Sequence, residues 1–303
     1  MTADERVGRI LFDGIVDYAG LYPPAALDMS TAVRNYAQYR TGESAWILGR
    51  FVCPTVALAS FSVEAGDQLP RAPEAAPWRL SATGSGDIAV DVQATASFNA
   101  RHAYGAVVDT IEVKATSIDD IDVIDDAVPR DITTYIEIPV ASDPTPWLVA
   151  IARVGRRPKI RMGGVTPDAF PSSANVVRFL RACAEHQLVA KATAGLHHPL
   201  RGTYRLTYDA NAPLGLMFGF LNVFLATALL ASGGPSDAVQ RLVEESDAGT
   251  IVMHDDGIVW HDGAHDHYFD RALLTRVRAT SLVSFGSCSF REPVDESRAL
   301  GVL

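Results

Sequence analysis

Eight short runs rich in β-branched and aromatic residues recur along this chain of 303 residues, and longer segments with helix-like spacing separate them. This alternation is typical of βα units, in which parallel strands form a sheet and helices cover it. The eight runs span residues 10–18, 46–53, 78–83, 107–115, 133–139, 159–162, 189–194 and 281–290. The count predicts an α/β fold, a (β/α)8 TIM-like barrel. An open doubly wound α/β sheet is the alternative, because a sequence does not show whether the sheet closes.

The domain organisation follows from the length of the chain. About 300 residues can form two domains, but a barrel of βα units commonly uses that many in one. We therefore expect residues 1–303 to form a single α/β barrel domain. In the late part of the chain, two short apolar runs flank Asp256 and Gly257, a residue pair that favours a tight turn. This pattern predicts an inserted β-hairpin near residues 250–268.

Composition excludes several classes of protein. Apolar residues make up 48% of the chain, which is too many for a disordered protein. The formal net charge of -10 argues against a general nucleic-acid partner. The three cysteines are far apart and show no C-x-x-C spacing, as in a protein of a reducing compartment. With no apolar segment at the N-terminus, we expect a cytoplasmic location.

One segment, Leu214–Ser232, is uncharged and nearly as long as a membrane-spanning helix. It also contains Gly215 and Gly219, at a spacing that lets membrane helices pack closely. Against a membrane span, Asn222 lies in the middle of the segment and the flanks lack basic clusters. We expect no membrane contact, and instead a helix that is buried in the core or in a subunit interface. The second case would make the protein a homo-oligomer.

Charged residues occupy strand positions where a buried strand would carry apolar side chains. The seven positions are Arg50, Glu112, Lys114, Glu137, Lys159, Arg161 and Lys191. Burying an unpaired charge costs on the order of several kcal/mol, so such side chains are expected to be paired or functional. We expect them near the carboxyl ends of the strands, where the active sites of barrels lie. A structural ion network inside the barrel is the alternative.

These residue types suit a small phosphorylated or carboxylated metabolite. Cations bind anionic groups, so we expect substrate binding by Arg50, Lys114, Lys159, Arg161 and Arg201. Carboxyl groups transfer protons, and Glu112 and Glu137 are the acid/base candidates. Glycines after strand ends let backbone N–H groups approach a ligand, and the candidates are Gly163, Gly164 and Gly195.

Lys191 has a more specific prediction. Apolar neighbours and other cations would lower the pKa of a strand lysine, and the free amine could then form a Schiff base. A simple role as an anion ligand or ion-pair partner is the alternative. The runs PKIRMGG and VAKATAG resemble the paired lysine strands of class I aldolases of the deoxyribose-phosphate type. That resemblance implies a lyase.

Histidines follow the seventh run. His197 and His198 come directly after the strand that carries Lys191, and we expect one of them to act as an acid/base group or substrate contact. We predict no cofactor. A divalent metal held by these histidines and a strand carboxylate is the alternative, and it would make the protein a metal-assisted hydrolase. Cys288 has no base nearby in the sequence, so we expect a small buried residue there.

Four longer runs, DYAGLYPPAALDM, WILGRFVCP, KIRMGG and AKATAGLHHPLRG, resemble a family of uncharacterised bacterial proteins. The resemblance implies a bacterial origin and one intact domain, and it brings no activity with it. On chemical grounds Asp17 is a further candidate, and the Gly/Pro turn after it would form a rigid turn or close over the barrel. The favoured function is a barrel lyase or aldolase, with the hydrolase and a non-catalytic anion-binding oligomer as alternatives.

Overall fold

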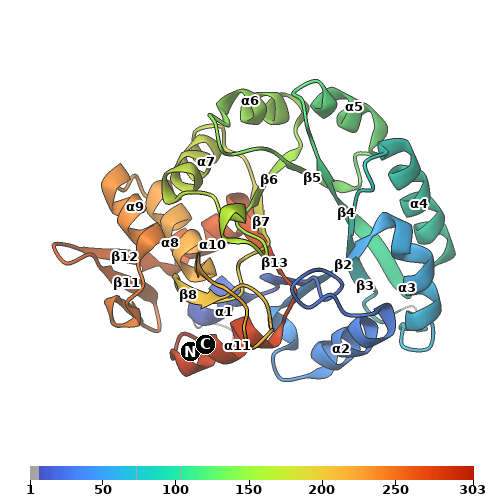
Figure 1. Ribbon diagram of the computed structural model, residues 1–303, viewed down its shortest axis with the longest axis horizontal. Coiled ribbons are helices and arrows are strands. Elements are labelled where there is room, and N and C mark those ends of the chain that lie inside the picture. The colour runs from blue at the N-terminus through green and yellow to red at the C-terminus, as the bar shows by residue number, and fades with distance from the viewer. Residues whose placement is uncertain (1–6, 73, 103) are drawn as a thin grey trace.

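The computed structural model, which describes residues 7–72, 74–102 and 104–303, has a closed barrel of eight parallel strands at its centre (Figure 1). The barrel strands are Val16–Tyr18 (β1), Leu48–Pro54 (β2), Trp78–Thr83 (β3), Ala106–Lys114 (β4), Thr133–Glu137 (β5), Arg157–Arg161 (β6), Ala190–Thr193 (β7) and Leu282–Ser287 (β13). Their order around the barrel is β1-β13-β7-β6-β5-β4-β3-β2. The predicted (β/α)8 barrel is therefore confirmed, and the open sheet is wrong.

Helices form a ring outside the barrel, as Figure 1 shows. In chain order they are Val7–Phe12 (α1), Met29–Thr41 (α2), Leu58–Ala65 (α3), Ile88–Arg101 (α4), Asp120–Ala127 (α5), Thr145–Val154 (α6), Ser173–Glu185 (α7), Phe220–Ala231 (α8), Ser236–Glu244 (α9), Arg271–Thr280 (α10) and Arg291–Ala299 (α11). Local sequence sets several of their ends. Asp87, Ser172 and Asp270 cap α4, α7 and α10 by accepting hydrogen bonds from backbone N–H groups of the first turn. Gly155 ends α6 in the left-handed conformation that glycine adopts without strain.

The first predicted strand, residues 10–18, is only partly a strand. Its beginning belongs to α1, whose buried residues Val7 and Leu11 are spaced four apart, as on one helix face. Gly14 then takes a positive φ of 58°, and the chain turns into β1. A run of apolar residues can serve a helix as well as a strand, and the glycine divides the two here.

The segment Leu214–Ser232 was wrongly predicted as one helix. Its first residues form the strand Leu214–Met217 (β9), which pairs with Gly202–Arg205 (β8) in a small hairpin. At the turn into α8, a Cβ on Gly219 would lie 2.4 Å from backbone atoms of Pro199 and Leu200, so only glycine fits there. In the part of the chain that the structure describes, no helix combines the length and the apolar character that crossing a membrane requires.

The connection between β7 and β13 is much longer than a single helix. It contains β8, β9, α8, α9, a three-stranded sheet and α10. The three antiparallel strands are Ile251–Met253 (β10), Gly257–His261 (β11) and Asp266–Asp270 (β12). The segment predicted as a hairpin near residues 250–268 thus contains a third strand. Figure 1 shows this sheet, with α8 and α9, extending from one side of the barrel.

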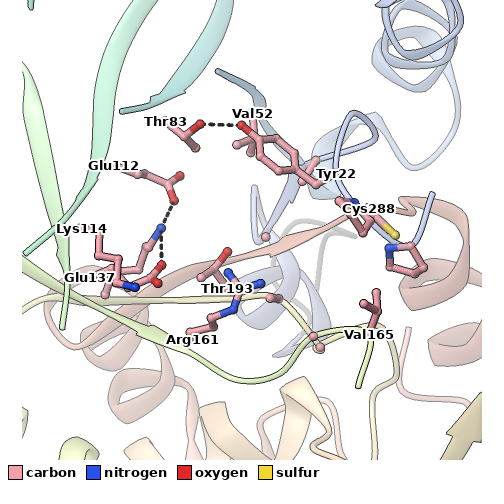
Figure 2. Close-up of a pocket in the computed structure, with 18 of the residues that line it drawn as sticks. Tyr22, Val52, Thr83, Glu112, Lys114, Glu137, Arg161, Val165, Thr193 and Cys288 are labelled. Carbon is pink, nitrogen blue, oxygen red and sulfur yellow. Dashed lines mark hydrogen bonds and ion pairs between the residues drawn. The ribbon is translucent and has the colours of Figure 1, made fainter. Parts of the chain in front are cut away.

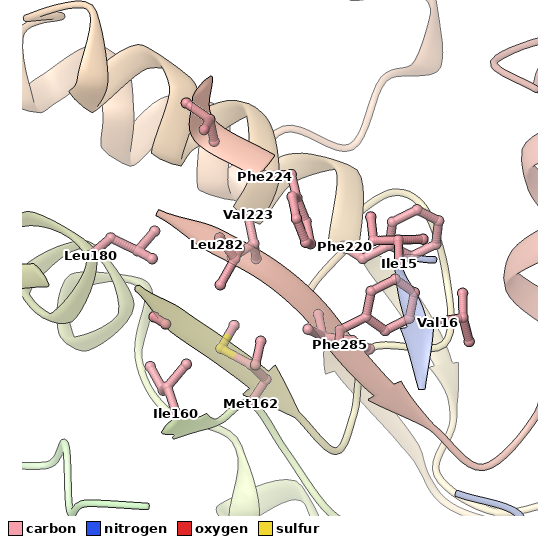
Figure 3. Close-up of a cluster of buried hydrophobic side chains, with 14 of the residues drawn as sticks. Ile15, Val16, Ile160, Met162, Leu180, Phe220, Val223, Phe224, Leu282 and Phe285 are labelled. Atoms are coloured by element: carbon pink, nitrogen blue, oxygen red, sulfur yellow. The ribbon is translucent and has the colours of Figure 1, made fainter. Parts of the chain in front are cut away.

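The helix α8 is apolar on all sides because it has neighbours on all sides. Residues 220–229 are buried, and α8 packs against α7, α9, α10 and β13. Figure 3 shows Phe220, Val223 and Phe224 of α8 lying over Leu282 and Phe285 of β13. The rings of Phe220 and Phe285 stack with their centroids 4.6 Å apart. The prediction that this segment is buried in the core therefore holds for α8.

Asn222, a polar residue within α8, joins three backbone segments. It is fully buried, its side-chain nitrogen donates to the carbonyl oxygens of Leu242 and Glu245 (2.9 Å each), and its Oδ1 accepts the backbone N–H of Arg201 (2.9 Å). We predict that Asn222→Leu lowers the free energy of unfolding by about 3 kcal/mol, because it leaves buried backbone groups without partners. Urea denaturation measures this loss. Thr227→Val, whose hydroxyl bonds only within α8 (Val223 O, 2.8 Å), is the control and should cost about 1 kcal/mol or less.

Candidate functional site

A cavity of about 340 Å³ lies at the carboxyl ends of the barrel strands (Figure 2). Four of its lining residues, Lys114, Glu137, Arg161 and Thr193, are the last residues of β4, β5, β6 and β7. Parallel strands in a closed barrel all end at the same rim, so residues far apart in the sequence meet there. The remaining predicted site residues on the lining are Glu112, Lys159, Gly164, Gly195 and His197.

Lys159 is held between two carboxylates on the floor of the cavity. Its Nζ lies 3.0 Å from Oε2 of Glu112 and 2.9 Å from Oε2 of Glu137. Burial alone would lower the pKa of Lys159, but the two carboxylates outweigh burial and raise it. Lys159 is therefore a cation, and Glu112 and Glu137 are the carboxylates in contact with it.

Lys191 lies deeper than Lys159 and is only 1% exposed. Its Nζ donates to Asp17 Oδ2 (2.5 Å) and to Glu112 Oε1 (2.6 Å). Burial favours the neutral amine, but the carboxylates of Asp17 and Glu112 prevail and raise the pKa of Lys191 well above its usual value. The predicted lowering of this pKa is wrong, because the sequence concealed the two acids that surround the amine.

Glu112 receives hydrogen bonds from both lysines and from Ser81. The Ser81 hydroxyl lies 2.6 Å from Glu112 Oε1. Burial would raise the pKa of Glu112, but the charges of Lys191 and Lys159 and these hydrogen bonds hold it far below its usual range. Glu112 is thus a fixed anion, whereas Glu137, at the end of its strand, lies where the cavity opens.

Two cations of the lining have no such partner. Within residues 7–72, 74–102 and 104–303, no carboxylate lies within ion-pair distance of Lys114 or Arg161, and both residues are exposed. Cations without a counter-ion at the mouth of a cavity are available to bind an anionic group. The chain has a net charge of -10, so this local excess of free positive charge is a property of the site and not of the protein as a whole.

Besides Lys191, four predicted residues lie outside the cavity lining. Arg50 is nearer the amino ends of the strands and pairs with Asp109 (2.6 Å). Arg201 donates to the Glu244 carbonyl oxygen (3.3 Å). His198 bonds to Glu296 (2.8 Å) and stacks on Tyr204. A Cβ on Gly163 would meet the ring of Phe170, so this glycine serves packing. The alternation along the strand correctly predicted that Arg50 faces the barrel interior. It did not show that Arg50 lies in a layer of side chains below the cavity.

The turn after β1 forms one wall of the cavity. Ala19, Tyr22, Pro23 and Pro24 line it, and the Tyr22 hydroxyl lies 2.6 Å from Thr83 Oγ1 at the end of β3 (Figure 2). Burial raises the pKa of Tyr22, so the phenol stays neutral. The rigid-turn and closing alternatives therefore describe the same feature, a turn rich in Gly and Pro that borders the site.

Cys288 is buried, as predicted, but it also lines the cavity, on the far side from Glu112, Lys114 and Glu137 (Figure 2). Its Sγ is 3.8 Å from Nδ1 of His197. These two residues are 91 positions apart, which is why no base was visible near Cys288. The available signal was the place of this cysteine, directly after the last barrel strand and three residues before α11 begins.

The two histidines that the metal alternative requires do not face a common site in the described residues. His197 and His198 face different neighbours, Cys288 and Glu296 respectively. Among the residues that the structure describes, no group of three or more His, Cys, Asp or Glu side chains is arranged to hold a metal ion. The hydrolase alternative therefore has no geometric support in this part of the chain.

Comparison of the chain with models of known protein families, with curated proteins and with solved structures gives no match. The fold and the cavity are consequently the basis on which a function can be assigned. The resemblances to class I aldolases and to bacterial proteins stay predictions.

We predict that Lys191→Met lowers the free energy of unfolding by about 3–5 kcal/mol at pH 7, because it leaves buried carboxylates without their counter-ion. The depressed pKa of Glu112 stabilises the fold above the unfolded pKa of Glu, about 4.3, and this contribution disappears as the pH falls through the folded pKa. In the variant, Glu112 has lost the Lys191 charge and takes up a proton at a higher pH than in the wild type, so the difference between the two should be smaller at pH 4 than at pH 7 in urea denaturation. Lys114→Met, at an exposed lysine, should change stability by about 0.5 kcal/mol or less at both pH values. An equal loss in both variants would contradict this account.

Proposed function

We propose that the protein is an enzyme that acts on a small carbonyl compound carrying a phosphate or carboxylate group. The observation that carries this proposal is the arrangement of Lys114 and Arg161, two cations without carboxylate partners in the described residues, beside the Glu137–Lys159 ion pair. The free cations bind the anionic group of the substrate, and the ion pair meets its reactive end. The cavity volume of about 340 Å³ suits a molecule of a few carbon atoms with one such group.

The reaction class that we propose is that of a lyase or aldolase acting through a lysine amine. Lys159 is the better candidate for this amine than Lys191, because Lys159 lines the cavity and Lys191 is enclosed by Asp17 and Glu112. Lys191 then has the alternative role predicted from the sequence, that of an ion-pair partner. It holds Glu112 in place, and Glu112 in turn orients Lys159.

The proposed reaction needs a proton acceptor because the resting amine is charged. Glu137 Oε2 lies 2.9 Å from Lys159 Nζ, within reach for direct transfer. The Lys159 amine would pass a proton to Glu137 as the carbonyl compound enters, and the neutral amine would then attack the carbonyl carbon. Glu137 returns the proton to the hydroxyl group of the adduct, which leaves as water. The protonated imine that forms withdraws electrons from the neighbouring carbon–carbon bond.

The anion-binding part of the proposal is tested with Arg161→Ala. Loss of one charge-assisted contact, at about 1.5–3 kcal/mol, should weaken the binding of inorganic phosphate or pyruvate about 10- to 100-fold in calorimetry. Arg153→Ala, at an exposed arginine that pairs with Asp122 outside the cavity, is the matched control and should bind as the wild type does. Unchanged binding in Arg161→Ala would contradict the assignment of the anion site.

The lyase part is tested by borohydride reduction in the presence of pyruvate, glyoxylate or dihydroxyacetone phosphate. We expect a covalent adduct in intact-mass spectra, located at Lys159 by peptide mapping and absent from Lys159→Met. Lys114→Met should still form the adduct, with weaker apparent affinity. An adduct on Lys114, or no adduct with any of the three compounds, would contradict the lyase assignment.

A further inference from the structure

The wall of the cavity opposite the lysines contains a cluster that the proposed reaction does not use. Its centre is Cys288, which is 4% exposed and lines the cavity. The Nδ1 atom of His197 lies 3.8 Å from the sulfur, and the Tyr208 hydroxyl lies 3.5 Å from it. The three residues come from the segments that follow β13, β7 and β8, so the cluster depends on the tertiary fold.

Glu292 of α11 fixes the imidazole in this cluster. Its Oε2 lies 3.3 Å from His197 Nδ1 and accepts a hydrogen bond from the Tyr208 hydroxyl at 2.8 Å. Burial would lower the pKa of His197, but its contacts with Cys288 and Glu292 outweigh burial and raise the pKa to about 9. The imidazole is therefore a cation at neutral pH, positioned beside a thiol.

The other two cysteines differ from Cys288 in their surroundings. Burial raises the pKa of the Cys53 thiol to about 12 and that of Cys183 still higher. In the described part of the chain, neither has a histidine within hydrogen-bond distance. A thiol becomes a nucleophile when a neighbouring cation stabilises its thiolate form. Of the three cysteines, Cys288 is the one with this neighbour and with access to a cavity.

We propose that Cys288 is a nucleophile of this cavity, and that with His197 it adds reversibly to the carbonyl carbon of an aldehyde that carries an anionic group. The nature of this ligand rests on the proposed function, whereas the reactivity of the thiol does not. The ionisable side chains around the thiol are His197, Tyr208 and Glu292, with Tyr18 of β1 beyond them. Among them His197 is the cation.

The addition balances without a further reactant. The thiolate sulfur forms a bond to the carbonyl carbon, and the π electrons of the carbonyl bond move to its oxygen. That oxygen takes the proton of the His197 imidazolium, which leaves a hemithioacetal and a neutral imidazole. The reverse step returns the proton and releases the aldehyde. The anionic group of the ligand meanwhile lies toward Lys114 and Arg161, which line the same cavity.

The thiol is tested with iodoacetamide, whose carbon forms a bond to sulfur as iodide leaves. We expect the folded protein at pH 7 to be labelled at Cys288 and at neither of the other cysteines. His197→Gln should label at least about tenfold more slowly, and Cys183→Ala should label at the wild-type rate. Circular dichroism establishes that each variant is folded, and Glu292→Gln provides a second, milder perturbation of the imidazole. Equal rates in wild type, His197→Gln and Glu292→Gln would overturn the proposal.

The ligand class is tested by protection from labelling. Glyceraldehyde 3-phosphate should protect Cys288 at concentrations at least about tenfold lower than glycerol 3-phosphate, which has the same phosphate but no carbonyl group. The difference should persist in Lys159→Met, where no imine can form at that position. Equal protection by both compounds, or loss of the difference in Lys159→Met, would overturn addition to the thiol. Persistent protection without any borohydride adduct would support the thiol and contradict the lyase assignment.

Discussion

The contact on which the barrel interior depends is the buried ion pair of Lys191 with Asp17 and Glu112. It joins β7 to β1 and β4, strands that are not all neighbours in the sheet. Asp17 also accepts the backbone N–H of Arg50 (2.6 Å) and the hydroxyl of Ser284 (2.9 Å), so β2 and β13 are tied to the same carboxylate. Barrel interiors are usually filled with branched apolar side chains. Here charges fill the layer below the cavity, and each has its partner.

This layer determines which groups the cavity above it presents. Glu112 is shared by both lysines, so it is fixed and remains ionised. Lys159 is consequently held from below, while Glu137 contacts it at the rim. The ion network and the proposed site are thus two layers of the same structure. The lower layer is enclosed by its own partners, whereas the Glu137–Lys159 pair borders the cavity.

The sequence contained the periodic part of this structure. All eight barrel strands overlap runs of β-branched and aromatic residues, and several of the charges at strand positions line the cavity. The pattern could not show how deep in the barrel each charged side chain lies or which residue it pairs with. Two residues along a strand span about 6.6 Å, and this distance separates the layer of side chains that holds Arg50 from the layer that lines the cavity. The direction of the Lys191 pKa depended on Asp17, which is 174 positions away, so no local reading could supply it.

The long connection between β7 and β13 explains why the two walls of the cavity differ. Short βα units bring β4, β5 and β6 to the rim with one charged residue at each end, Lys114, Glu137 and Arg161. The inserted segment instead brings Tyr208 to Cys288, and α11 adds Glu292. These contacts depend on the position of the insertion, which α8 packs against β13 through its apolar surface. The cation-rich wall is therefore a product of strand periodicity, and the thiol wall is a product of the insertion.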